Sequence, residues 1–248
     1  SGNVAVTMTA SGGARTITLS NPGATALDVQ SGSSVSLRGT TGAGTRFMNM
    51  DFTGTGNIAT IAGTLTVTNV GEGTDYDATN TVTTVTGTLR NDGSSTGTDG
   101  TITSNATNLI IASGGTYDHA LDGGNIPTAT WSVLSTCSVT GVVNTVPTVA
   151  SFAQSFGNFA WNCAAQTGDL SLIGNLLTVN GNFTMTNTNS GSLRLSNSGV
   201  TDILNVGGNY SQTGGTFYMA GTAGANTWTM NVAGDFTIAG GTFNMNGN

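Results

Sequence analysis

A Gly-Asn-aromatic phrase returns along the second half of the chain at almost constant spacing, and this spacing restricts the fold more than any other feature. The phrase reads GNF from Gly157 and from Gly181, GNY from Gly208 and GDF from Gly234. A second phrase follows each copy, as GDLSL, GSLRL, GTFYM and GTFNM. The repeat length is about 24–27 residues, and a unit this short cannot bury its own apolar face. Repeats of this length therefore bury that face by stacking on their neighbours.

Within each phrase, apolar residues alternate with small polar residues, which is the pattern of a β-strand with one buried face. We therefore predict an all-β chain that forms a single-domain parallel β-solenoid with about ten coils of 24–27 residues. Right-handed winding (a right-handed β-helix) is expected, because crossovers between parallel strands are almost always right-handed. The alternative is an antiparallel sandwich or jelly roll, in which Gly and Asn only mark the turns of hairpins.

The first half of the chain carries a weaker copy of the repeat. The segment GNIATIAGTLTV from Gly56 has two apolar positions, Ile58 and Leu65, with the same offset as the two phrases. We expect one continuous solenoid over residues 1–248, with less regular coils over 1–125 and regular coils over 126–248. The residues predicted to stack in one column are Val4, Ile58, Val82, Leu109, Phe159, Phe183, Tyr210 and Phe236.

Stacked coils predict two ladders of side chains, with about 4.8 Å between successive rungs. The interior aromatic ladder consists of Phe159, Phe183, Tyr210 and Phe236. The corner ladder consists of Asn158, Asn182, Asn209 and Asp235. In the corner ladder each amide can donate to the equivalent carbonyl of the next coil. The Gly that precedes each corner residue is expected to provide a backbone position with positive φ.

The composition excludes several functions. Only 7% of the residues are charged, lysine is absent, and the five arginines are scattered singly against twelve acidic residues. Nucleic-acid binding needs a clustered basic surface, so we expect no nucleic-acid partner. No apolar run is long enough for a membrane-spanning helix, so we expect no membrane insertion. Abundant Thr and Asn without Lys are typical of extracellular proteins, and we predict an extracellular, cell-surface location.

The two cysteines, Cys137 and Cys163, are separated along the chain by the length of one predicted coil. Stacking would bring their Cα atoms within the range that a disulfide spans. A disulfide that ties adjacent coils together is therefore a candidate. The alternative is a pair of buried free thiols.

Other polar residues offer weaker candidates. The only histidine, His119, is expected to be solvated on a corner loop, and Glu72, Asp75 and Asp77 could hold Ca²⁺ but are expected to form a solvated loop. The acidic residues occur mostly once per coil, without the paired carboxylates of a glycosidase, so we expect no enzyme activity and no cofactor. Runs such as TLTVT and TVTTVTGT are similar to ice-binding ladders, but they do not keep one register along the sequence.

Part of the chain resembles a known class of proteins. The stretches GGTYDHALDGGNIPTATWSVLSTCSVTGV and FGNFAWNCAAQTGDLSLIGNLLTVNGNFTMTNTNSGSLRL resemble repetitive, secreted surface proteins of Bacteroidota. These proteins are typically large and β-helical and leave the cell through the type IX secretion system. The resemblance covers about Gly114–Leu195. It implies surface attachment, adhesion or gliding, and it assigns no catalytic residue.

The two ends of the sequence repeat the same phrase. The final NMNGN reads like the VNGN before Phe183, and the initial SGNVAVTMT reads like its continuation. We therefore expect an extracellular structural protein, which is a subunit or segment of a filament built by head-to-tail stacking of its own coils. The alternative is a cell-surface adhesin or glycan-binding module, with exposed aromatic residues such as Tyr218 or Trp228 as stacking platforms for surface glycans.

Overall fold

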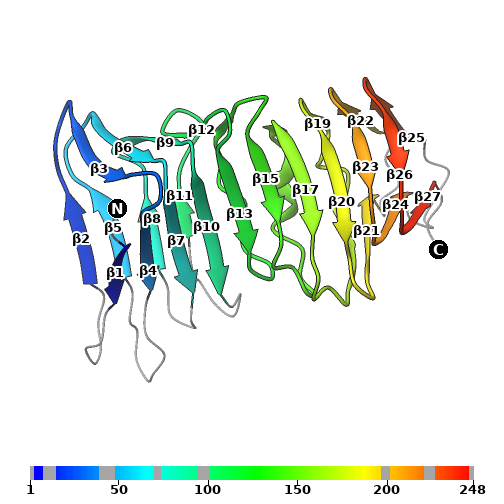
Figure 1. Ribbon diagram of the computed structural model, residues 1–248, viewed down its shortest axis with the longest axis horizontal. Helices are drawn as coiled ribbons and strands as arrows, with labels where there is room; N and C mark the ends of the chain where they lie inside the picture. Colours follow the sequence, from blue (N-terminus) through cyan, green and yellow to red (C-terminus); the bar gives the residue numbers. More distant parts are fainter. Residues whose placement is uncertain are drawn as a thin grey trace.

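The computed structural model is an elongated rod of parallel β-strands stacked along one axis (Figure 1). It describes residues 3–7, 15–38, 48–69, 74–93, 101–196, 202–220 and 227–245. Within these ranges every paired strand is parallel to its neighbour, and the only helical element is a short 3₁₀ turn, η1 (Val149–Phe152). The predicted all-β parallel solenoid is therefore confirmed, and the antiparallel sandwich is excluded.

One sheet of ten strands, the long sheet, runs through the whole rod. Its strands in order are β1 (Asn3–Thr7), β4 (Ser34–Arg38), β7 (Thr64–Asn69), β10 (Thr88–Gly93), β13 (Thr116–Ala120), β15 (Thr136–Val139), β17 (Asn158–Asn162), β20 (Phe183–Asn187), β23 (Tyr210–Gln212) and β26 (Phe236–Ile238). The β-branched and aromatic residues of these strands suit a pleated, half-buried surface.

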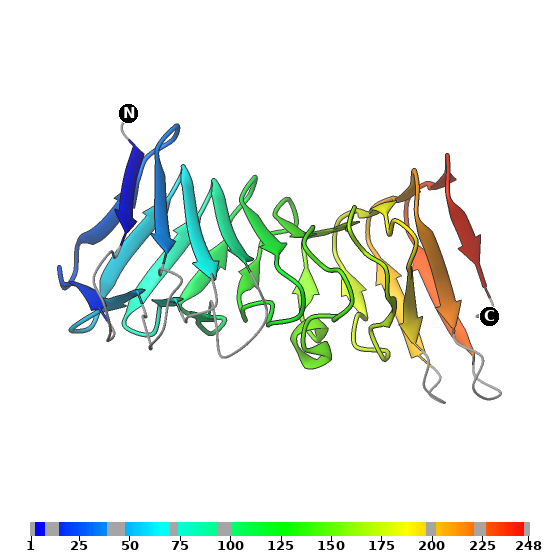
Figure 2. The same cartoon turned by 90° about the horizontal axis from the view of Figure 1, so that it is seen from below.

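Four shorter sheets form the other two sides of the rod, two in each half (Figure 2). In the first half, sheet B contains β2 (Arg15–Leu19), β5 (Met48–Phe52), β8 (Thr74–Asp77) and β11 (Thr101–Thr103), and sheet C contains β3 (Thr25–Val29), β6 (Asn57–Ile61), β9 (Thr81–Val85), β12 (Leu109–Ile111) and β14 (Thr130–Trp131). In the second half, sheet D contains β16 (Ser155–Phe156), β19 (Thr178–Val179), β22 (Asp202–Val206) and β25 (Trp228–Val232), and sheet E contains β18 (Asp169–Ser171), β21 (Ser192–Ser196), β24 (Thr216–Ala220) and β27 (Thr242–Asn244).

The number of complete coils is about seven, slightly fewer than the ten predicted. A complete coil has one strand in each of three sheets, and these coils are β2–β4, β5–β7, β8–β10, β11–β13, β18–β20, β21–β23 and β24–β26. Two coils in the middle of the rod, which contain β14–β15 and β16–β17, have only two strands each. The spacing between register partners also varies more than predicted, since the step from Tyr117 to Cys137 is much shorter than the step from Val4 to Val35. The handedness of the winding stays a prediction.

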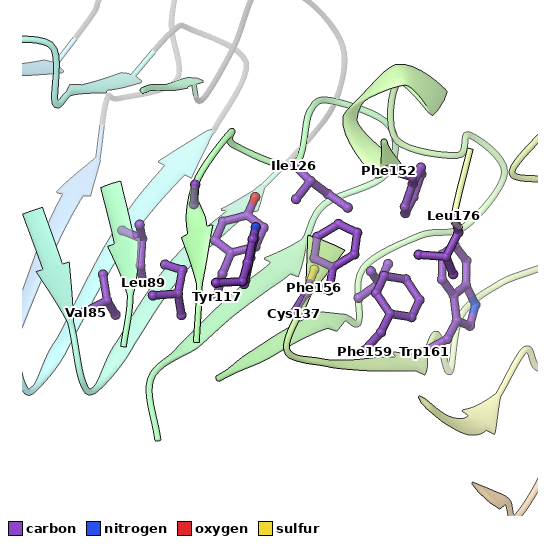
Figure 3. Packing of buried hydrophobic residues seen from close by; sticks show 14 of the residues in the cluster. Val85, Leu89, Tyr117, Ile126, Cys137, Phe152, Phe156, Phe159, Trp161 and Leu176 are labelled. Atoms are coloured by element: carbon purple, nitrogen blue, oxygen red, sulfur yellow. The ribbon is translucent and has the colours of Figure 1, made fainter. Parts of the chain in front are cut away.

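The interior of the rod is a continuous apolar column behind the long sheet. Its members are successive register partners, and each has no exposed surface: Leu65, Leu89, Tyr117, Cys137, Phe159, Phe183 and Tyr210. Figure 3 shows Leu89, Tyr117, Cys137 and Phe159 following one another along this interior. Full burial of an apolar side chain contributes about 1.5–3 kcal/mol, so the column is a major source of stability.

In the first half of the rod the predicted column is correct in register for Val4, whose partner Val35 pairs with Leu65, but it is wrong for Ile58, Val82 and Leu109. Ile58 and Val82 lie in sheet C, where their side chains point outward with 39% and 42% exposed. Leu109 also lies in sheet C, although it is buried. The column instead contains Leu65 and Leu89, because the first phrase of each repeat forms a side strand in this half and a strand of the long sheet in the other half. The spacing identifies stacked strands, but it does not identify which of the three sides they form.

Candidate functional site

The last coil of the described chain leaves three strand edges and its apolar interior uncovered. β25, β26 and β27 are the edge strands of sheet D, the long sheet and sheet E, respectively. Phe236, Ile238 and Met245 of this coil are 48%, 46% and 72% exposed. One coil earlier, Tyr210 and Gln212 are the register partners of Phe236 and Ile238, and both are fully buried. We call the surface formed by β25–β27 and Met245 the open coil.

The interior aromatic residues stack one above another and end at the open coil. The ring centroids of Phe159 and Phe183 are 5.5 Å apart, and those of Phe183 and Tyr210 are 5.4 Å apart, both in edge-to-face contact. Tyr210 and Phe236 are stacked with 4.8 Å between centroids. The first three rings are fully buried, whereas Phe236 has neighbours on one side only among the described residues. The strands carrying these rings are parallel and adjacent, as the sequence predicts.

The four corner residues lie at equivalent positions on successive coils, but their hydrogen bonds differ from those predicted. The Oδ1 atom of Asn158 accepts a hydrogen bond from the backbone N–H of Asn182 at 2.9 Å. In the same way Asn182 accepts from the N–H of Asn209, and Asn209 accepts from the N–H of Asp235, both at 2.8 Å. The ladder therefore joins side-chain carbonyls to backbone amides, and it extends to Asp235 at the open coil.

The Gly of each Gly-Asn corner is required for close approach between coils and not for positive φ, so that part of the prediction is wrong. None of Gly157, Gly181, Gly208 and Gly234 has positive φ. A Cβ atom on Gly181, Gly208 or Gly234 would overlap the Oδ1 atom of the corner Asn in the preceding coil. The motif repeats as Gly-Asn because each glycine leaves room for the side-chain carbonyl of the corner Asn in the preceding coil. That carbonyl accepts a hydrogen bond from the backbone N–H of the residue after the glycine.

We expect the substitution Gly208→Ala to lower the free energy of unfolding by about 1–3 kcal/mol, because the added methyl group overpacks the corner ladder. Its nearest contact would be Asn182 Oδ1, followed by the backbone carbonyl carbon of Gly181 at 2.9 Å. Urea unfolding of Gly208→Ala, Asn182→Ala and the double variant forms a double-mutant cycle. The double variant should lose less than the sum of the two single losses, and strict additivity would contradict this explanation of the motif.

The predicted disulfide between Cys137 and Cys163 is not formed, and both residues are buried free cysteines. The coil at this point is shorter than predicted, so the register partner of Cys137 is Phe159. Cys163 lies four residues beyond Phe159, about 13 Å along the strand direction at the usual rise per residue. That separation is too large for a disulfide. Burial raises the pKa of the Cys163 thiol to about 12, and it also raises the pKa of Cys137.

His119 lies in the interior of the rod and not on a solvated corner, which corrects the prediction. Its side chain has no exposed surface. Nε2–H donates to the carbonyl oxygen of Gly123 at 2.7 Å, and Nδ1 accepts from the hydroxyl of Tyr117 at 3.0 Å. Burial lowers the pKa of His119 to about 4, so the ring is neutral near pH 7. Both ring nitrogens are used, which indicates a structural role.

Three carboxylates meet on the outer surface of sheet B. Atoms of Asp51, Asp75 and Asp77 lie within 4.8 Å of one another. Asp75 and Asp77 lie on β8 and not on the solvated loop that was predicted, and Glu72 lies outside the described residues. Thr101 donates a hydrogen bond to Asp75 at 2.8 Å. Burial raises the pKa of Asp51 and Asp75, and repulsion from Asp77 adds to the effect. Ca²⁺ takes six to eight oxygen ligands, of which these carboxylates could supply part.

Asp51 was not among the residues predicted to form this group. Its separation from Asp77 along the chain equals the length of one predicted coil. Comparing the acidic residues at one-coil offsets would therefore have brought Asp51 and Asp77 together.

The two aromatic residues proposed as glycan platforms have different environments. Trp228 lies on β25 opposite Asp202 and packs against the core, so it belongs to the interior of the open coil. Tyr218 lies on β24 between two buried residues and points outward from sheet E. The guanidinium carbon of Arg194, on the neighbouring strand, lies 5.3 Å from the centroid of the Tyr218 ring.

Comparison of the chain with protein-family models, with curated proteins and with solved structures finds no match. Among the described residues, no helix is long and apolar enough to cross a membrane.

Proposed function

We propose that this chain is an extracellular structural protein, a subunit or segment of a cell-surface filament built by end-to-end stacking of β-solenoid coils. The observation that carries the proposal is the open coil. Its exposed phenylalanine and isoleucine occupy positions that are fully buried one coil earlier, so a further coil of the same kind would bury them in the same way. Among the described residues, β25, β26 and β27 are each the last strand of a parallel sheet, and such edge strands favour the addition of further strands.

The partner that we assign to the open coil is the β1 end of a second copy of this chain. β1 is the opposite edge of the long sheet and runs in the same direction as β26. Asn3 on β1 lies in the register row of Ser34, which is the row that continues into the corner ladder. A contact between two different ends of one molecule does not close on itself, so it generates a fibre. The resemblance of Gly114–Leu195 to secreted surface proteins of Bacteroidota supports a cell-surface location for that fibre.

Sedimentation velocity of the purified chain over a range of concentrations tests this proposal. The wild-type chain should form species larger than a monomer as concentration rises. The substitution Ile238→Asp places a charge on the open coil and should leave a monomer. Ile203→Asp is the matched control, because Ile203 is also 46% exposed but points outward from β22. A wild-type chain that stays monomeric throughout, or equal effects of the two variants, would overturn the proposed assembly.

A further inference from the structure

The outer surface of sheet E carries a combination of side chains that differs from the other outer surfaces of the rod. One row across its strands contains Ser171, Arg194, Tyr218 and Asn244 as successive register partners. The row beside it begins with Asp169 and Ser192 and continues with Thr216 and Thr242. An aromatic ring, a guanidinium group, a carboxylate, an amide and the hydroxyls of Thr216 and Thr242 therefore lie on the outer side of sheet E.

Tyr218 is unusual among the aromatic residues that the structure describes. The others are either buried in the rod or, like Trp228, Phe236 and Phe243, part of the interior of the open coil. Among the described aromatic residues, Tyr218 alone points outward from the middle of a side sheet. A tyrosine ring provides a large, rigid contact surface at a low cost in side-chain entropy. Rigid aromatic rings beside adaptable polar side chains are also the residues that binding surfaces use most.

Arg194 is held in place on this surface, while part of its hydrogen-bonding capacity is unused. Its guanidinium group packs on the Tyr218 ring, and its side chain is only 19% exposed. The distance from Nη2 to the Asp169 carboxylate is 3.7 Å, which is longer than a hydrogen bond. Nε is buried, so a ligand on the outer surface does not reach it, although it has no hydrogen-bond partner among the described residues. The donors that remain for a bound molecule are those of the terminal nitrogens, of which Nη2 is too far from Asp169 for a hydrogen bond.

Asp169 provides an acceptor at the edge of the same surface. Its side chain is 63% exposed, and one carboxylate oxygen accepts a hydrogen bond from the Ser192 hydroxyl at 2.6 Å. The positive charge of Arg194 and the negative charge of Asp169 balance each other, so the surface attracts neither anions nor cations strongly. A neutral ligand with many hydroxyl groups and an apolar face fits this combination best.

We propose that the outer surface of sheet E binds a neutral polysaccharide, in which a sugar ring stacks on the face of the Tyr218 ring that Arg194 does not cover. Arg194 donates hydrogen bonds to sugar hydroxyls, and Asp169 accepts hydrogen bonds from them. The hydroxyls of Thr216 and Thr242 extend the polar contacts along the rod axis. This site lies on a side of the rod and does not depend on assembly through the open coil.

Affinity electrophoresis in native gels tests the site, because the net charge of −7 gives the chain its own mobility. The gels contain a soluble β-1,3-glucan, a galactomannan, an arabinoxylan or the charged polymer polygalacturonate. At least one neutral polysaccharide should retard the wild-type chain. Tyr218→Ala and Tyr218→Thr should weaken this retardation at least fivefold, and Tyr218→Phe, which keeps the ring, should retain it. Thr retains β-propensity and so provides a second variant if the Ala variant folds poorly.

The matched control is Asn205→Ala, which alters an exposed residue of sheet D and should leave retardation unchanged. The proposal is overturned if no neutral polysaccharide retards the chain, if polygalacturonate alone does so, or if the Tyr218 variants migrate like wild type. Running the same gels with Ile238→Asp separates the two proposals, since this variant should still be retarded even when it no longer assembles.

Discussion

Replacing Phe183 by alanine is expected to lower the free energy of unfolding by about 3–5 kcal/mol, the usual cost of removing a fully buried phenylalanine. The Phe183 ring has no exposed surface and makes edge-to-face contacts with Phe159, Tyr210 and Phe217, whose centroids are 5.4–5.6 Å away. Such aromatic pairs add about 0.5–1.5 kcal/mol each beyond the area that they bury. Because the ring lies between two coils, its removal should weaken stacking on both sides. Urea unfolding followed by circular dichroism measures the loss.

Two further variants show whether the loss comes from position in the interior ladder. Phe236→Ala removes the last ring of the same column, and it should cost clearly less because Phe236 is 48% exposed. Thr184→Ala changes an outward neighbour of Phe183 and should alter stability by no more than about 0.5 kcal/mol. Equal losses for Phe183→Ala and Phe236→Ala would contradict the description of the open coil.

Acidification is expected to destabilise the rod through His119. The folded-state pKa of about 4 lies below the value of 6.5 for an unperturbed histidine, because burial disfavours the charged ring. Between these two values the unfolded chain binds a proton that the folded chain does not bind. The stabilising contribution is therefore complete above about pH 6.5 and is lost as the pH falls towards 4. The total loss is about 3 kcal/mol, with a slope of up to about 1.4 kcal/mol per pH unit.

The variant His119→Gln separates this effect from the titration of the carboxylates. An amide side chain can donate to Gly123 and accept from Tyr117 as the neutral imidazole does, but it has no proton to gain. Unfolding free energies of the two proteins should be measured between pH 7 and pH 4. The difference between wild type and variant should change by about 3 kcal/mol over this range. Parallel pH profiles would show that His119 is not buried in its neutral form.

The repeat spacing in the second half of the chain was sufficient to predict the fold and the stacking of like residues. Four aromatic residues recur at equivalent positions of successive repeats, and the structure places them on adjacent strands: Phe159, Phe183, Tyr210 and Phe236. The same reasoning assigned Ile58 and Val82 to the wrong side of the rod. A solenoid has three sides with similar strand patterns, and sequence periodicity does not distinguish between them.

The failed disulfide prediction has a related cause. The prediction took the separation of Cys137 and Cys163 along the chain as the length of one coil. The coil that begins at Cys137 is shorter, so the residue stacked on Cys137 is Phe159. This coil is short because the two central coils each lack one side strand. Local coil length depends on how loops such as the η1 segment pack, which no repeat pattern reports. The buried position of His119 has a different cause, since the polar, glycine-rich sequence around it is typical of a loop but forms a strand of the long sheet.

Engineered disulfides between register partners test most directly that successive coils lie parallel and in register. Thr184 and Ser211 are partners on β20 and β23, and both side chains lie on the outer surface of the long sheet. The native Cys137 and Cys163 should remain unreactive, because burial raises the pKa of both thiols. Mild oxidation of Thr184→Cys/Ser211→Cys should give a nearly complete intramolecular disulfide, since adjacent strands are about 4.8 Å apart. Little or no disulfide should form in Thr184→Cys/Thr213→Cys, because Thr213 lies two residues beyond the register partner of Thr184. More efficient cross-linking of this second pair than of the first would contradict the stacked-coil structure.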